Sequence, residues 1–145
     1  MRWALLCMIC IGPLLVGCGG GGTKKKENET NTVFKLLKQE FENRYPGSTL
    51  QRDSALDKAC YEHADTWAYA GTTNYNSNLS TTHGNSPQKR ANYFGYSGTV
   101  RVDKGCYFAD PQTPTSEVAQ WFINAGALND PNCTRIGIAR YYCPS

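Results

Sequence analysis

The first 17 residues decide how much of the chain is left to fold into a domain. Arg2 gives a short positive start, and residues 3–16 are almost entirely apolar. This run is shorter than the roughly 20 residues that a membrane-spanning helix needs, and it has the length of an export-signal core. We therefore expect residues 1–17 to be a signal peptide and the rest of the 145-residue chain to form one domain.

The end of the apolar run, Leu15-Val16-Gly17-Cys18, resembles the bacterial lipoprotein signal. In that signal a cysteine after small or aliphatic residues receives lipid before the chain is cut in front of it. An ordinary secretory signal with an incidental cysteine is the alternative. The resemblance implies that Cys18 anchors the protein to a membrane, at the outer membrane or surface of a bacterial cell envelope.

Residues 18–31 read as a tether between the anchor and the domain. Four glycines follow Cys18, and the next residues are mostly charged or polar. Glycine gives a flexible coil and charge keeps it solvated. We expect a flexible linker here, followed by a domain over residues 32–145.

The charge pattern argues against a nucleic-acid partner. Fifteen basic residues face 12 acidic ones, which gives a formal net charge of +3. The basic residues are scattered, and no base-stacking motif is present. We expect the membrane, and a protein, lipid or cell-wall ligand, to be the partners.

Four cysteines remain after Cys7 and Cys10 in the signal and Cys18 at the anchor are set aside: Cys60, Cys106, Cys133 and Cys143. Four cysteines in an exported domain predict two disulfides. A zinc site is the alternative, but these four have no CxxC spacing. If residues 134–142 are extended, Cys133 and Cys143 are about 30 Å apart and cannot pair with each other. Each would then pair with Cys60 or Cys106, in an order that the sequence leaves open.

Helices and strands alternate along the domain. The apolar spacing and the capping residues predict helices over residues 31–44, 53–71, 86–95 and from 113 onward, and strands over 99–108 and 134–142. His63 falls on the apolar stripe of the second helix, which favours a buried structural histidine. A small sheet covered by helices accommodates this order of elements.

Four stretches resemble the CAP superfamily, which comprises cysteine-rich secretory proteins, antigen 5 and plant pathogenesis-related proteins and includes bacterial SCP-like extracellular domains. They are residues 36–71, with Asp53, Leu56, Ala59, His63, Ala64 and Gly71 at the family's positions, SPQKRANYFGYSG, TPTSEVAQWF and DPNCTRIGIA. The resemblance implies an α/β fold, a three-layer α/β/α sandwich around a small antiparallel sheet. Family domains continue into a further aromatic-rich strand, so the sheet here is expected to be truncated, with an edge left to cover.

The cleft of that family usually holds two histidines and two acids, which bind a divalent metal in some members. His83 lies in the loop of the first histidine, but closer to Ser86 than the family spacing. The region of the second histidine, residues 121–133, contains none. Asp103 is the nearest equivalent of one acid, and Glu117 is a candidate for another. We therefore expect a degenerate cleft with no metal and no cofactor.

These residues lead to two functional hypotheses. The first is a non-enzymatic binding or envelope-surface module, with the polar loop 72–85 as a contact surface. The alternative is a cell-envelope hydrolase or peptidase that uses His83 with Asp103 or Glu117 as a general-base pair. A stable structural remnant at the envelope is a third reading that the sequence does not separate from the first.

Overall fold

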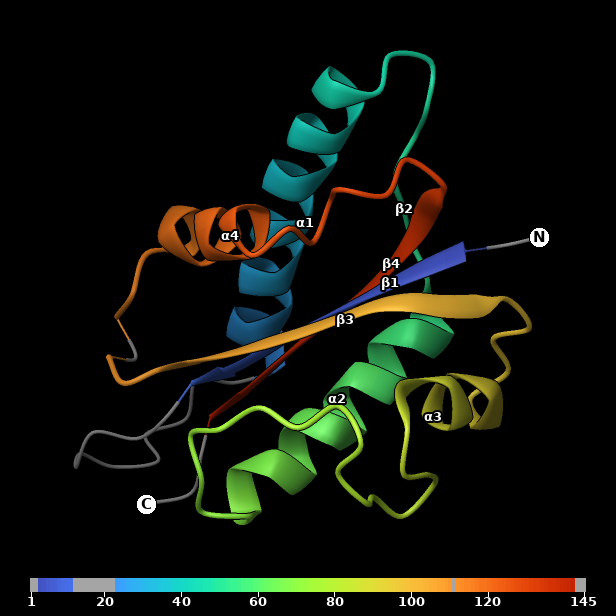
Figure 1. Ribbon diagram of the computed structural model, residues 1–145. Coiled ribbons are helices and arrows are strands. Elements are labelled where there is room, and N and C mark those ends of the chain that lie inside the picture. Colours follow the sequence, from blue (N-terminus) through green and yellow to red (C-terminus); the bar gives the residue numbers. More distant parts are fainter. Residues whose placement is uncertain (1–2, 12–22, 111, 143–145) are drawn as a thin grey trace.

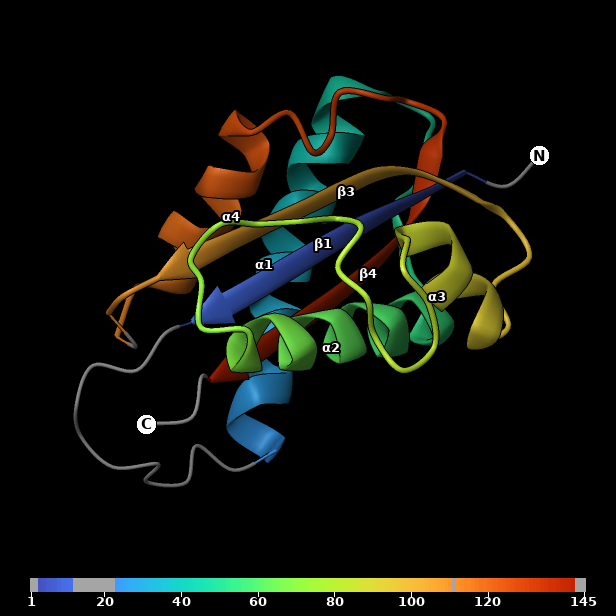
Figure 2. The ribbon, with the colours of Figure 1, turned by 60° about the horizontal axis from the view of Figure 1, so that its bottom comes forward.

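The structure is a computed structural model that describes residues 3–11, 23–110 and 112–142. Its elements in chain order are β1 Trp3–Ile11, α1 Thr23–Arg44, β2 Gln51–Arg52, α2 Ser54–Tyr69, α3 Pro87–Tyr93, β3 Thr99–Phe108, α4 Thr115–Asn124 and β4 Cys133–Tyr142. Helices α1 and α4 cover one face of the sheet, and α2 and α3 cover the other (Figures 1 and 2). The three-layer α/β architecture expected from the sequence is confirmed.

Alternate residues of β4 pack into the two helical layers. Ile136 and Ile138 belong to the same apolar cluster as Phe41 of α1 and Phe122 of α4. Ala139 belongs to the cluster formed around α2 and α3. Successive side chains of a strand point to opposite faces, so this one strand supplies both cores.

The four strands follow the order β2-β4-β1-β3, and all three pairings are parallel. The expected antiparallel sheet is therefore wrong in this detail. The connections between successive strands contain helices, which return the chain in the same direction, as parallel pairing requires. The two edge strands of the sheet are β2 and β3. A truncated sheet with one uncovered edge was expected from the sequence.

Strand β1 occupies the middle of the sheet, although it comes from the segment expected to be a signal peptide. Its nine residues pair with β3 on one side and with β4 on the other. The sequence WALLCMICI is uncharged throughout. A continuous apolar run suits a parallel strand that is covered on both faces as well as it suits an export signal. No described helix is long and apolar enough to cross a membrane.

Helix α1 begins at Thr23, eight residues before the start expected at Asn31. Residues 23–31, predicted to be part of a flexible tether, are therefore helical. The first turns are fixed by ion pairing between Glu29 and Arg140 of β4 and by a 2.6 Å hydrogen bond from Arg52 to Asn31. These contacts come from parts of the chain that are distant in sequence, so local composition gave no sign of them.

The helix starts follow the capping rules. The Asp53 carboxylate accepts hydrogen bonds from the backbone N–H groups of Ala55 and Leu56, at 2.9 and 3.2 Å. The Ser86 hydroxyl accepts one from the backbone of Lys89 at 3.2 Å, and Pro87 occupies the first turn, where its missing N–H costs nothing. Asp53 and Ser86 are therefore the N-caps of α2 and α3.

The expected disulfides are not formed among Cys60, Cys106 and Cys133, which are buried as thiols. Cys106 aligns with Ile9 of β1 and Cys133 with Trp3, six residues away along the strand. This offset separates them by roughly 20 Å, beyond the reach of a disulfide. Burial raises the pKa of Cys133 to about 11 and raises that of Cys106 further. Cys143 lies outside the described residues.

Helix α2 approaches the sheet so closely that Gly137 has no room for a side chain. A Cβ atom at Gly137 would lie 2.3 Å from the carbonyl carbon of Leu56 and 2.5 Å from its Cβ. The obstacle is backbone, which cannot turn aside as a flexible side chain would. The absence of a side chain at this position thus sets the distance between α2 and β4.

Gly137→Ala is expected to lower the free energy of unfolding by about 1–3 kcal/mol, because α2 must move off β4. Urea unfolding followed by circular dichroism measures the change. Asn124→Ala, at an exposed position on α4, is the control and should leave the midpoint unchanged. Equal midpoints for Gly137→Ala and the wild type would show that the two elements are not in contact.

Candidate functional site

The buried guanidinium of Arg90 organises the region around the candidate residues. Arg90 lies on α3 and is fully buried. Its guanidinium donates to the backbone carbonyls of Ser77 at 2.7 Å and Leu79 at 3.1 Å, and its Nη2 lies 3.0 Å from Nδ1 of His63. One side chain therefore fixes the polar loop 72–85 against α2 and α3.

His63 is a neutral, structural histidine, as its position on the apolar stripe predicted. Its Nε2 lies 2.8 Å from the carbonyl oxygen of Asn76 and must donate the proton there. Nδ1 is then the acceptor for Arg90. Burial first, and the Arg90 charge second, lower the pKa of His63 to about 4. A ring with both nitrogens engaged inside the protein has none left for a substrate.

Asp103 faces the same interior through a bulge in β3. The register with β1 skips Arg101, because Ala4 aligns with Val100 and Leu5 with Val102. The extra residue reverses which side chains point to which face, and it turns Asp103 toward α2. Its carboxylate accepts a 2.5 Å hydrogen bond from the Tyr75 hydroxyl. Burial raises the pKa of the Asp103 carboxyl, and hydrogen bonding from Tyr75 opposes that shift.

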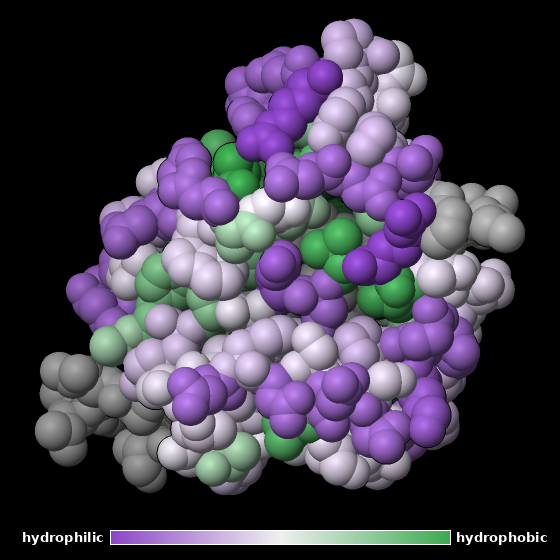
Figure 3. All heavy atoms as spheres, in the orientation of Figure 1, coloured by the Kyte–Doolittle hydropathy of each residue, from purple (hydrophilic) through white to green (hydrophobic). Residues whose placement is uncertain are grey.

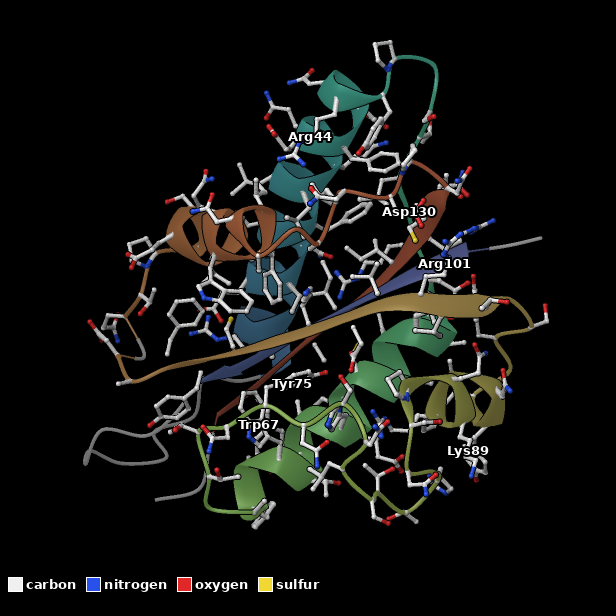
Figure 4. The ribbon with its side chains drawn as sticks, in the orientation of Figure 1. Arg44, Trp67, Tyr75, Lys89, Arg101 and Asp130 are labelled. Atoms are coloured by element: carbon white, nitrogen blue, oxygen red, sulfur yellow. The ribbon has the colours of Figure 1, made fainter. Side chains whose placement is uncertain are left out.

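Tyr75 is held in place by the ring of Trp67 and by a glycine of β3. The two rings meet edge to face with centroids 5.2 Å apart, between α2 and β3 (Figure 4). A Cβ at Gly105 would lie 2.3 Å from the Tyr75 ring. The tyrosine therefore lies directly on the strand and covers the Asp103 carboxylate.

His83 belongs to a second, more exposed group. Its Nδ1 is 2.5 Å from the Glu62 carboxylate, and the same carboxylate accepts from the Thr81 hydroxyl at 2.8 Å. The His83 ring stacks on Tyr93 with centroids 3.6 Å apart and an interplanar angle of 13°. About 30% of the His83 side chain and 14% of the Glu62 side chain are exposed. These four residues, Glu62, Thr81, His83 and Tyr93, are called the His83 cluster below.

The structure separates the three residues that the hydrolase hypothesis would combine. His83 is bound to Glu62, and Asp103 to Tyr75. Glu117 is exposed in the first turn of α4, in the layer on the other side of the sheet. Glu62 was not predicted from the sequence as the partner of His83. A local signal was available, because Glu62 lies one turn from Lys58 and Thr66 on the polar side of α2, immediately before His63.

The described residues do not fit the metal site that the family resemblance raised. No three His, Cys, Asp or Glu side chains in the described part of the chain gather closely enough to hold an ion. His63 has both ring nitrogens engaged, and the Asp103 carboxylate is bound by the Tyr75 hydroxyl. A zinc ion needs three or four converging ligands, and this interior offers a hydrogen-bond network in their place.

A comparison with known protein families gives a match over most of the chain. The family model for the cysteine-rich secretory protein family, CAP, matches residues 45–145. The chain belongs to the CAP family. No curated protein sequence and no solved structure gives a significant match. The CAP match covers β2 to β4 and leaves β1 and the whole of α1 outside it.

The depressed pKa of His63 predicts that this CAP domain loses stability in mild acid. The unfolded chain binds a proton near pH 6.5 and the folded chain only near pH 4, so the unfolded state holds more protons in between. The free energy of unfolding should fall from about pH 6.5 to about pH 4, by on the order of 3 kcal/mol at most.

Urea unfolding at a series of pH values measures this dependence, and His63→Gln should remove most of the slope in that range. His83→Gln is the matched control, since its ring is on the surface. A slope that persists unchanged in His63→Gln would assign the acid sensitivity to other groups.

Proposed function

We propose that this CAP protein is a lipid-anchored lipoprotein of the bacterial cell envelope whose domain binds a ligand without transforming it. The observation that carries the proposal is the placement of the candidate cleft residues His83, Asp103 and Glu117. Asp103 is bound into the interior network, His83 is paired with Glu62, and Glu117 lies in the opposite layer. Side chains committed to internal hydrogen bonds support a scaffold better than they support a catalyst.

The His83 cluster and the adjoining loop 72–85 are the surface that we assign to ligand binding. Tyr93 is 59% exposed, and its ring is held by stacking on His83. The loop is polar, and Arg90 holds its backbone in one conformation. In Figure 3, hydrophilic residues cover most of the face shown and hydrophobic residues form small separate patches. A rigid polar surface with an exposed aromatic ring suits a cell-wall polymer, which offers hydroxyl and amide groups.

The alternative is a cell-envelope hydrolase, and one contact favours keeping it. Glu62 engages Nδ1 of His83, which is how a carboxylate orients a catalytic imidazole, and Nε2 is then the nitrogen that would receive a proton. The original pairing of His83 with Asp103 or Glu117 would require these elements to rearrange. The hydrolase would therefore use His83 with Glu62.

One experiment separates the two functions. Purified peptidoglycan sacculi are incubated with the protein, and both the bound protein and the released soluble fragments are measured. We expect the protein to sediment with the sacculi, no release above buffer, and at least threefold weaker binding for Tyr93→Ala. Tyr61→Ala is the control, because it removes an exposed tyrosine that lies on α2 and not on α3.

Two results would contradict binding without chemistry. Failure to sediment with sacculi would refute the cell-wall ligand. Release of fragments that drops at least tenfold in both His83→Ala and Glu62→Gln, but not in Tyr61→Ala, would establish the hydrolase.

The anchor is tested by metabolic labelling with radioactive palmitate in a bacterial host. Cys18→Ala should abolish the label, because its thiol is the proposed acceptor of the lipid. Cys10→Ala, which removes a thiol inside the expected signal, should retain it. Label that persists in Cys18→Ala would refute the anchor and leave the binding assay unaffected.

A further inference from the structure

The central strand of the sheet and the expected signal peptide are the same segment. Strand β1, Trp3–Ile11, aligns residue by residue with β3 and β4, which meet only through it. If processing in front of Cys18 removes this segment, the position between β3 and β4 loses its strand. This inference rests on the proposed cleavage of the chain in front of Cys18.

The vacated position has a defined size and chemistry. Neighbouring strands are about 4.8 Å apart, so β3 and β4 are separated by roughly 9.5 Å, the width of one inserted strand. About half of the residues on each flanking strand direct their backbone N–H and C=O groups toward it. Buried backbone groups without partners are strongly unfavourable. The occupant that fits is an extended, uncharged segment of about nine residues, parallel to both neighbours.

Strands β3 and β4 are held apart by the helical layers. On β4, the backbone of Ile138 donates to Asp57 at 2.8 Å and accepts from Arg52 at 3.1 Å. Gly137 of the same strand lies against Leu56. These contacts fix the strand to β2 and to the start of α2.

On β3, the backbone N–H of Val100 donates to the side chain of Gln88 on α3 at 2.8 Å. Further along the strand, Asp103 and Gly105 are fixed by Tyr75. If β3 closed onto β4, one of the two strands would have to shift by a full strand spacing, and these contacts would break.

We propose that the slot between β3 and β4 is a strand-binding site that, in the processed protein, takes an extended apolar segment of another envelope protein. Main-chain hydrogen bonds on both sides would supply affinity, as in other cases of strand addition. The segment that occupies the slot in the full chain shows which chemistry is accepted: nine residues without a charge. The family match begins at Tyr45, so the slot lies within the conserved domain and its present occupant lies outside it.

The first test asks whether the full chain holds β1 in the register described. Ile9→Cys is made in a background with Cys7→Ser and Cys10→Ser, because Ile9 aligns with Cys106. Mild oxidation should link positions 9 and 106, and peptide mapping should detect the bond. Met8→Cys is the control, since adjacent residues point to opposite faces of a sheet. Equal linking from positions 8 and 9 would overturn the register and with it the proposal.

The second test empties the slot after the full chain has folded. A protease recognition sequence is placed among residues 19–22, Cys18→Ser prevents lipidation, and the chain is cut after purification. The probe is a synthetic peptide of residues 3–11 with serine at both cysteines and lysines at each end. The control peptide carries Leu6→Pro, which cannot donate to the ladder.

Hydrogen exchange at the β3 and β4 amides is the readout. Removing the cut segment should accelerate exchange at least tenfold, and the probe should restore protection while the proline peptide does not. Retention of the cut segment without a covalent bond would equally demonstrate a strand-binding slot. Protection that persists in the emptied chain without peptide would mean that the sheet has closed, and it would refute the proposal.

If the emptied chain aggregates, refolding from urea decides the question. The probe should raise the recovered soluble fraction severalfold over the proline peptide, and equal recovery would refute the slot. Because Cys18 is substituted in the cleaved chain, the outcome is independent of lipidation. A working slot together with failed palmitate labelling would therefore remove the anchor alone.

Discussion

The burial of Arg90 is the constraint on which the α2–α3 side of the molecule depends. A guanidinium without exposure needs partners inside the protein, and here its two terminal nitrogens bind two loop carbonyls and a neutral histidine. This requirement fixes the conformation of the loop, the protonation of His63 and the distance between α2 and α3. The exposed His83 cluster is rigid because it is built on this buried support. Replacing Arg90 would therefore disturb the interior and the proposed binding surface together.

Much of the fold was accessible from the sequence because its signals are local. Asp53 and Ser86 mark their helix starts with side chains that can cap them, and the stripe on α2 correctly placed His63 in the core. Four stretches, among them the one around Arg90, indicated the family, and the family supplied the layers. In each case the deciding interaction joins residues a few positions apart or belongs to a pattern already known.

The rest depended on contacts that no local pattern encodes. The bulge at Arg101 turns Asp103 inward, and its effect is visible only when β3 is aligned with β1. Glu62 became the partner of His83 because the loop folds back across α2, 21 residues later. The extra helical turns before Asn31 depend on Arg140, at the other end of the chain. The parallel pairing of the strands likewise depends on their order in the sheet, and hydrophobic spacing does not determine that order.

The position of β1 has a consequence for how the domain folds. The middle strand β1 is synthesised long before its neighbour β4, because helices α1 to α4 and strands β2 and β3 lie between them in the chain, so the sheet cannot be completed until β4 is available. Contacts this distant in sequence close slowly, since chain entropy is lost before any pairing compensates for it. A nascent chain would thus remain open through most of its synthesis. For the export signal proposed above, that delay would keep the apolar N-terminus accessible to the export machinery while the rest of the chain is synthesised.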